Sequence, residues 1–176
     1  MKPDHEVVIV GLGPTGATLA NILAGYGIDV LVLEREEAVY PLPRAVHFDD
    51  EAMRVFQSIG LAGGIGRDAR VNVGTKFVDR DQNLLLDWPR PQDNGPLGRY
   101  PSYRFHQPDL EAELNRGIAA CDSVALRRAA HVTSVHDHGD HVDVRYDYDG
   151  SSHQVSAEYV IGTDGARSVV RGAMDS

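Results

Sequence analysis

The sequence contains very little cysteine, no long apolar run and fewer basic than acidic residues, and each of these shortages excludes a class of protein. Cys121 is the single cysteine among 176 residues, so no intrachain disulfide and no cysteine-based zinc cluster can form. The longest apolar runs, such as residues 7–10 and 30–33, are far too short to cross a membrane. The 17 Lys and Arg against 26 Asp and Glu give a formal net charge of −9, which argues against a nucleic-acid or anionic-membrane surface.

The rest of the composition is typical of one folded domain. Hydrophobic residues make up 42% and charged residues 24% of the chain, which is too apolar for a disordered protein. At about 150 residues per domain, the length predicts a single domain whose core needs no metal or disulfide. The amino terminus leads straight into a strand pattern without the apolar stretch of a signal peptide, so we expect a cytoplasmic protein.

The hydrophobic pattern at the start of the chain predicts a βαβ unit. Apolar runs at residues 6–10 and 29–33 are typical of buried parallel strands. Small residues along one side of residues 14–26 are typical of a helix that packs closely on a sheet. Further along the chain, we expect an extended loop at residues 40–44 and a helix at residues 49–59.

The remaining pattern predicts short strands, an irregular segment and an antiparallel meander. Strands are expected at residues 75–78 and 84–88, followed by a proline-rich irregular segment and a helix that begins at Gln107. Apolar and polar residues alternate over residues 131–161, with two turns that divide this segment into three strands. Helical character returns at residues 166–174. The fold class is therefore α/β, a Rossmann-like nucleotide-binding fold with a parallel sheet and an antiparallel three-stranded meander.

A glycine-rich turn between the first strand and the first helix is the sharpest functional signal. Residues 11–16 follow the G-x-G-x-x-G pattern in the strand–turn–helix context that a dinucleotide-binding fingerprint requires. Gly11 permits the tight turn, Gly13 lets a pyrophosphate approach the backbone, and Gly16 allows close packing of helix on strand. The N–H groups and the positive dipole end of the helix N-terminus favour phosphate binding.

Glu34 completes this fingerprint, because it stands 18 residues after Gly16, at the end of the second strand. A carboxylate at this place accepts hydrogen bonds from a ribose diol and repels a 2′-phosphate. FAD and NAD therefore both fit the site, whereas NADP does not. The fingerprint by itself does not distinguish FAD from NAD.

Two further motifs each have a functional and an ordinary interpretation. Asp164-Gly165 follows an apolar strand and precedes a helical segment with arginines, whereas Asp-Gly pairs usually form hairpin turns. Arg44 lies in an extended Pro-Arg-Ala loop, from which a guanidinium can reach a pyrophosphate or a flavin. The ordinary interpretation of Arg44 is a solvated loop arginine.

Taken together, the motifs resemble those of the FAD-dependent aromatic (phenol) hydroxylases, the family that includes p-hydroxybenzoate hydroxylase. Within that family, they are most similar to the 3-(3-hydroxyphenyl)propionate hydroxylases. The likeness covers nearly the whole chain and lies in residues 8–16, 33–35, 43–45, 49–52, 105–108 and 162–168. It implies an FAD-binding domain over residues 1–176.

The resemblance also implies contacts between FAD and particular residues. The pyrophosphate would be held by the glycine-rich turn, through Gly11, Gly13, Pro14, Thr15 and Gly16. Arg44 and Gln107 would contact the pyrophosphate and the ribityl chain. Glu34 would bind the adenosine ribose, Arg35 would lie along the adenine, and the backbone near Val132 would meet the adenine.

The implied function is an FAD-dependent monooxygenase that hydroxylates a phenolic aromatic acid with NADH or NADPH and O2, in aromatic compound catabolism. Asp164 and Gly165 would form the Asp-Gly motif that the family uses around FAD and the reduced nicotinamide cofactor. The flavin carries this chemistry, so no catalytic side chain is expected. The family's later Gly-Asp motif and its substrate-covering sheet do not occur in the 176 residues, so we expect the amino-terminal portion of such an enzyme, inactive alone. Whether the full-length protein forms a homo-oligomer stays open.

Three alternatives also stay open at this point. An NAD-dependent dehydrogenase explains the fingerprint and Glu34, but not the meander or the Asp-Gly ending. A non-catalytic dinucleotide-binding module explains the same residues without an active site. Another flavin enzyme of the same superfamily, such as a halogenase or an epoxidase, shares the fingerprint.

Histidines gather at the first turn of the expected meander. His136, His138 and His141 surround this turn, and two histidines two residues apart can share a strand face and bind a metal ion. Asp137 and Asp140 lie beside them and favour a solvated polar turn instead. No metal site is expected there.

Overall fold

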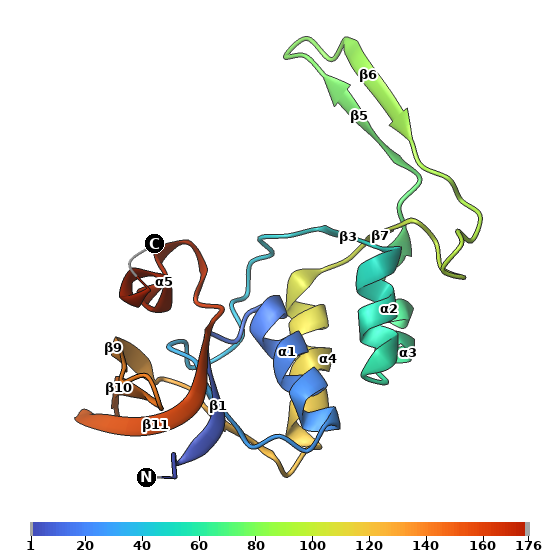
Figure 1. Ribbon diagram of the computed structural model, residues 1–176. Helices are drawn as coiled ribbons and strands as arrows, with labels where there is room; N and C mark the ends of the chain where they lie inside the picture. Colours follow the sequence, from blue (N-terminus) through green and yellow to red (C-terminus); the bar gives the residue numbers. More distant parts are fainter. Residues whose placement is uncertain (1, 175–176) are drawn as a thin grey trace. The chain divides into compact units, whose positions relative to one another are not determined.

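The computed structural model describes residues 2–174, which form two compact units (Figure 1). The sheet unit combines the chain up to Pro41 with the chain from Leu114 onward. The insert unit comprises Leu42–Glu113. Helix α4 (Gln107–Ala119) begins in the insert unit and ends in the sheet unit, so it carries the chain back to the sheet.

The sheet unit contains a six-stranded sheet in the order β8-β2-β1-β11-β10-β9. Its strands are β1 (His5–Val10), β2 (Val30–Leu33), β8 (Val124–Arg127), β9 (His131–Asp137), β10 (Val142–Tyr148) and β11 (Ser151–Gly162). Neighbours among β8, β2, β1 and β11 pair in parallel, and β11, β10 and β9 form an antiparallel meander. The predicted α/β fold with a parallel sheet and a meander is therefore confirmed. Strand β11, of 12 residues, joins the two parts, because Ser151–Ala157 pair with β10 and Ala157–Gly162 pair with β1.

The central strands of this sheet are buried on both faces. The last four residues of β1 and all four residues of β2 are buried. On one face, Val8 and Leu33 pack in a cluster that includes Val144 of β10. Helix α1 (Pro14–Gly25) contacts β1 and β2 as well. This two-sided burial explains why both strands are continuous apolar runs rather than alternating patterns.

A buried amide ties α1 to α4 in the sheet unit. Ala17 and Ala20 of α1 have no exposed surface, because small side chains let the helix approach its neighbours closely. The Nδ2 group of Asn21 donates to the carbonyl oxygen of Ala17 at 2.8 Å and to that of Leu114, in α4, at 3.0 Å. Leu114 and Ile118 turn the apolar side of α4 inward and are almost fully buried.

The insert unit holds two short helices and a small antiparallel sheet. Helix α2 (Asp50–Ser58) begins after Asp49, whose Oδ1 accepts the N–H of Ala52 at 2.9 Å, so the predicted helix is confirmed. The elements that the sequence pattern does not predict are α3 (Ala62–Asp68), β3 (His47–Asp49), β4 (Arg70–Val71) and β7 (Ser102–Arg104), as well as β8 of the sheet unit. The strands β3, β4 and β7 have only two or three residues, which is too few to show a period, and β8 includes Arg127 and lacks the uninterrupted apolar run of β2. All four form here because other segments pair with them.

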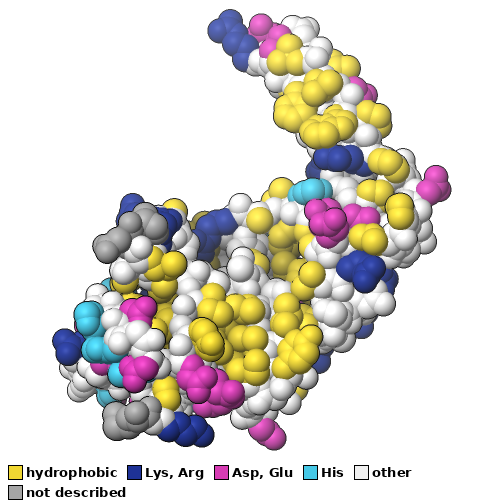
Figure 2. Space-filling view, in the orientation of Figure 1, with side chains coloured by type: hydrophobic (Ala, Val, Ile, Leu, Met, Phe, Trp, Pro, Cys, Tyr) yellow, Lys and Arg dark blue, Asp and Glu magenta, His cyan; other side chains and the backbone are white. Residues whose placement is uncertain are grey.

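The two predicted strands β5 (Gly74–Val78) and β6 (Leu84–Pro89) form a hairpin of the insert unit (Figure 1). Every residue of β6 is exposed, and hydrophobic side chains gather along the hairpin (Figure 2). The guanidinium of Arg90 lies 4.1 Å from the centre of the Trp88 ring. The hairpin is thus held by backbone pairing and by contacts among its own side chains.

Residues 166–174, which the sequence predicts to be one helix, do not form a single helix in the structure. A 3-10 turn (Gly165–Arg167) precedes the short helix α5 (Val169–Ala173). Ser168 stands between them, and its Oγ accepts the N–H of Arg171 at 2.9 Å, which begins a new helix instead of continuing the turn. Within residues 2–174, no helix combines the length and the hydropathy that a membrane span needs.

We expect Leu33→Ala to lower the free energy of unfolding by about 3 kcal/mol, because a buried Leu→Ala change leaves a cavity. Leu33 is 1% exposed in β2, whereas Leu126, on the neighbouring strand β8, is 37% exposed. Leu126→Ala is therefore the control, with an expected loss of about 1 kcal/mol or less. Urea unfolding followed by circular dichroism measures both changes. Equal losses in the two variants would contradict the central position of Leu33.

Candidate functional site

The predicted binding motifs of the sheet unit meet at one edge of its sheet. Val10, the last residue of β1, pairs with Leu33 of β2 and with Gly162 of β11. Because these strands are parallel, the loops that follow them leave from the same edge. The glycine-rich turn, Glu34 and Asp164-Gly165 follow these three strands, so the structure brings them together.

Two glycines of the turn are required by its packing. Gly11 has φ +98°, and a Cβ atom there would lie 2.7 Å from the carbonyl oxygen of Thr163. A Cβ atom on Gly16 would lie 2.1 Å from the carbonyl oxygen of Gly11. The packing of the turn therefore requires glycine at both positions.

Gly13 differs from the other two glycines, because a Cβ atom there would meet no heavy atom within 4 Å. Its backbone, with φ −71° and ψ −175°, suits any residue. The fold therefore does not require glycine at this position. The open space beside Gly13 is the feature that a phosphate in contact with the backbone would need.

The N-terminus of α1 lies at this open space and is suited to an anion. No side chain caps it, its first turn contains no acidic residue, and Pro14 occupies the first helical position. Thr15 follows on the exposed side of the turn. A helix end of this kind carries N–H groups and partial positive charge that attract a phosphate.

Thr163 is a residue that the site prediction omits. Its N–H donates to the carbonyl oxygen of Val10 at 2.8 Å, and its Oγ1 lies 2.7 Å from the carbonyl oxygen of Gly11. This side chain therefore fastens the loop after β11 to the glycine-rich turn. Its position between an apolar strand and an Asp-Gly pair is the signal in the sequence that could have identified it.

Glu34 directs its carboxylate toward the glycine-rich turn. Its Oε2 accepts the N–H of Leu12 at 2.5 Å, and its Oε1 accepts the N–H of Glu36 at 2.8 Å. A carboxylate can accept about four hydrogen bonds, so capacity for a ribose diol is left. The side chain of Arg35 forms an ion pair with Glu36 rather than with Glu34. Its Nε lies 3.1 Å from Oε1 of Glu36, and the side chain is 58% exposed.

The start of β9 lies beside Glu34. The N–H of Ala130 donates to the carbonyl oxygen of Glu34 at 2.9 Å. Val132, two residues later, is 5% exposed, and its strand forms one edge of the sheet. The structure therefore brings together the backbone near Val132 and the residue predicted to bind the ribose.

Asp164 uses its carboxylate to build the loop that contains it. Oδ1 accepts the hydroxyl of Ser168 at 2.6 Å, and Oδ2 accepts the N–H of Val169 at 2.7 Å. Gly165 has φ +79°, a conformation that favours glycine. The Asp-Gly pair therefore forms a turn into a short helix rather than a hairpin.

The insert unit contains the other two predicted residues, Arg44 and Gln107. The Oε1 atom of Gln107 accepts the backbone N–H groups of Arg44 and Ala45, both at 2.8 Å. Its Nε2 group donates to Oε1 of Glu111 at 2.6 Å, and both side chains are buried. Glu111, which the prediction also omits, thereby orients the amide of Gln107. Gln107 thus fixes the backbone that presents Arg44.

Comparisons with known proteins agree with this geometry. The model of the family described as "FAD binding domain" matches residues 4–176. A probable NADH-specific resorcinol 4-hydroxylase from Rhodococcus jostii is 44% identical over 94% of this chain and 32% of its own length. A 3-(3-hydroxy-phenyl)propionate/3-hydroxycinnamic acid hydroxylase from Mycolicibacterium gilvum is 39% identical over 98% of this chain and 30% of its own. The chain thus spans about a third of the length of these relatives.

Solved structures of monooxygenases share the fold of this chain. The p-nitrophenol 4-monooxygenase of Pseudomonas putida matches 99% of this chain and 44% of its own, with a TM-score of 0.87 and 26% identity. A flavin-dependent monooxygenase solved with FAD and substrate matches 99% of this chain and 33% of its own, with a TM-score of 0.86 and 25% identity.

We expect Gly16→Ala to lower the unfolding midpoint strongly, because its Cβ atom has no space beside the carbonyl oxygen of Gly11. Gly13→Ala is the matched control, and its midpoint should change by no more than about 2 °C. Differential scanning calorimetry compares the two proteins. An unchanged midpoint for Gly16→Ala would contradict the packing of the turn.

We expect Gln107→Ala to raise the hydrogen-exchange rates of the Arg44 and Ala45 amides by about tenfold or more, since both lose their acceptor. The control is Gln57→Ala on α2, where the Oε1 atom of Gln57 accepts a hydrogen bond from the side chain of Arg99 and not from either of these amides. Exchange followed by NMR or mass spectrometry measures the rates. Unchanged rates in Gln107→Ala would show that Gln107 does not hold the loop.

Proposed function

The chain belongs to the FAD-binding domain family, and on this premise we propose that it is the FAD-binding portion of a flavin-dependent aromatic hydroxylase. The observation that carries the proposal is the edge at which the uncapped α1 N-terminus and the Glu34 carboxylate lie together. The α1 end suits a diphosphate, and the carboxylate suits the ribose of an adenosine. Hydroxylases among the relatives favour this function over a dehydrogenase or a non-catalytic module.

The described residues fit FAD at this edge. The space beside Gly13 admits a diphosphate against the backbone, and the N–H groups of the first turn of α1 would bind it. In this proposal Gly11 and Gly16 shape the turn, while Pro14 and Thr15 begin the helix. FAD held by these residues would supply the redox chemistry of the reaction with NADH or NADPH and O2.

The other residues of the sheet unit orient the adenosine half of the cofactor. Glu34 would accept hydrogen bonds from the ribose, while it continues to accept the N–H of Leu12. Arg35 and the backbone near Val132 would lie along the adenine. Asp164 and Gly165 would act through the loop that they build, which Thr163 fastens to the turn.

Arg44 and Gln107 keep their predicted assignment to the cofactor in this proposal. The guanidinium of Arg44 is the group suited to a diphosphate, because it can form two parallel hydrogen bonds. Gln107 and Glu111 would act by holding the backbone of that loop in place. We assign no catalytic side chain, since these residues bind and orient.

The substrate of the whole enzyme is proposed to be a phenolic small molecule, with O2 and NADH or NADPH as co-substrates. Named relatives act on resorcinol or on hydroxyphenylpropionate. The net charge of −9 fits a protein that has neither a nucleic acid nor an anionic membrane as its partner. We place the protein in the cytoplasm as part of the same proposal.

We expect Gly13→Val to weaken FAD binding by at least about tenfold, or about 1.4 kcal/mol, because the branched side chain fills the space that a phosphate needs. Gly25→Val is the control, since Gly25 lies at the other end of α1 and a Cβ atom there also meets nothing within 4 Å. Titration of the FAD-free protein with FAD, followed by flavin fluorescence, gives the dissociation constant of each variant. Equal affinities in both variants would overturn the assignment of the turn, and preferential uptake of NAD would favour a dehydrogenase.

A further inference from the structure

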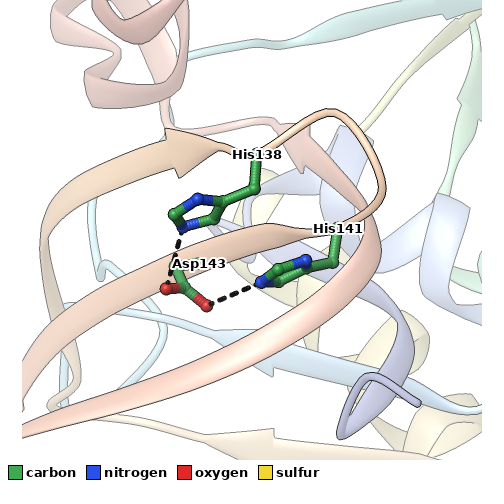
Figure 3. Close-up of side chains that lie close together, drawn as sticks. All are labelled: His138, His141 and Asp143. Atoms are coloured by element: carbon green, nitrogen blue, oxygen red, sulfur yellow. Dashed lines mark hydrogen bonds and ion pairs between the residues drawn. The ribbon is translucent and has the colours of Figure 1, made fainter. Parts of the chain in front are cut away.

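The turn between β9 and β10 brings together two histidines and an aspartate that the FAD site does not use (Figure 3). Nε2 of His138 lies 3.1 Å from Oδ2 of Asp143, and Nε2 of His141 lies 3.8 Å from Oδ1 of the same carboxylate. The two imidazole rings are stacked, with centres 4.7 Å apart and planes inclined by 16°. Both rings therefore present a nitrogen to one carboxylate.

We propose that His138, His141 and Asp143 form a binding site for a divalent transition-metal ion of the Zn²⁺ class. One ligand atom from each residue lies within 4.8 Å of the others. Ligands of a tetrahedral zinc ion are about 3.3 Å apart, given metal–nitrogen bonds of about 2.0–2.1 Å. The ligand atoms would therefore have to approach one another by at most about 1.5 Å, and rotation of side chains on a surface turn allows such a movement. Two imidazole nitrogens and one carboxylate oxygen suit zinc rather than magnesium.

Hydrogen bonds from behind hold two of the three ligands, His141 and Asp143, in their orientation. Nδ1 of His141 lies 2.7 Å from Oδ1 of Asp140, which places the ring proton on Nδ1 and leaves the Nε2 lone pair for a metal. Nε2 of Gln154 donates to Oδ2 of Asp143 at 2.9 Å, which fixes the carboxylate from β11.

The charge and the access at this turn also suit a cation. Asp137 and Asp140 add negative charge beside the ligands, and the ring of His136 lies 4.5 Å from that of His138. The His138 side chain is exposed, and those of His141 and Asp143 are partly exposed, so an ion can reach them from solvent.

The proposed metal site lies at the opposite end of the sheet from the glycine-rich turn. Val142, at the start of β10, pairs with Ala157, which also pairs with His5 at the first residue of β1. Gly11 follows the last residue of β1. An ion at the turn would therefore link β10 to the edge strand β9 and stabilise the meander without contact with the FAD site.

The experiment is a calorimetric titration of the chelator-treated protein with ZnCl2. We expect one equivalent to bind, and we expect His138→Gln, His141→Gln and Asp143→Asn each to weaken binding by at least about tenfold. The matched control is His131→Gln, an exposed histidine at the other end of β9 from the turn, and this variant should bind zinc as the parent does. Saturating zinc should also raise the unfolding midpoint of the parent by about 5 °C, and this rise should be lost in the three ligand variants.

Each other outcome would overturn the proposal. Absence of zinc binding would show a polar turn only, and binding that the three ligand variants leave unchanged would place the ion elsewhere, for example at Cys121. Equally tight binding of MgCl2 would indicate a carboxylate site without the imidazoles. His138 is partly exposed, with a side-chain accessibility of 38%, so His138→Gln should retain the fold by circular dichroism even if His141→Gln does not.

Discussion

The pairing of β1 between β2 and β11 is the constraint on which the sheet unit depends. Val10 pairs with both Leu33 and Gly162, so the three strands β1, β2 and β11 end side by side at the same edge of the sheet. A shift of one residue in either pairing would move buried side chains to the other face of their strand. The burial of β1 and β2 therefore keeps the register, and the register places Glu34 beside the glycine-rich turn.

In each of the two units, some polar groups are used to build the structure and others have capacity to bind a ligand. The Asp164 carboxylate is used by Ser168 and Val169, and the Gln107 amide is used by the Arg44 loop and Glu111. The N-terminus of α1, by contrast, has no side-chain cap. Groups that are held in position before a ligand arrives lose less conformational entropy when it binds. The contacts made by Thr163 and Glu34 therefore hold in place the turn that we propose to bind the diphosphate.

The predictable parts of this protein are those whose signal is local or periodic. The apolar runs of β1 and β2, the alternation in β10 and the G-x-G-x-x-G turn all depend on neighbouring residues, and each is present in the structure. The strands β3, β4 and β7 have too few residues for a pattern, β8 lacks the uninterrupted apolar run of β2, and all four exist because another segment pairs with them. The role of Thr163 depends on a partner 152 residues away, whereas Glu111 is only four residues from Gln107, and its role depends on the burial of both side chains.

The sequence by itself determined the order of the elements, the turn that only glycine can form at Gly11, and the acid at the end of the second strand, because backbone conformation and hydrophobic period act over a few residues. Only the tertiary structure decided which polar side chains serve the fold and which remain available. It turned Asp164 inward, oriented the amide of Gln107, and placed Asp143 of β10 against His138 and His141, where the sequence had indicated only a polar turn. The physical reason is that a hydrogen bond requires two groups within about 3 Å, and strand register and turn geometry set that distance, whatever the separation of the groups along the chain.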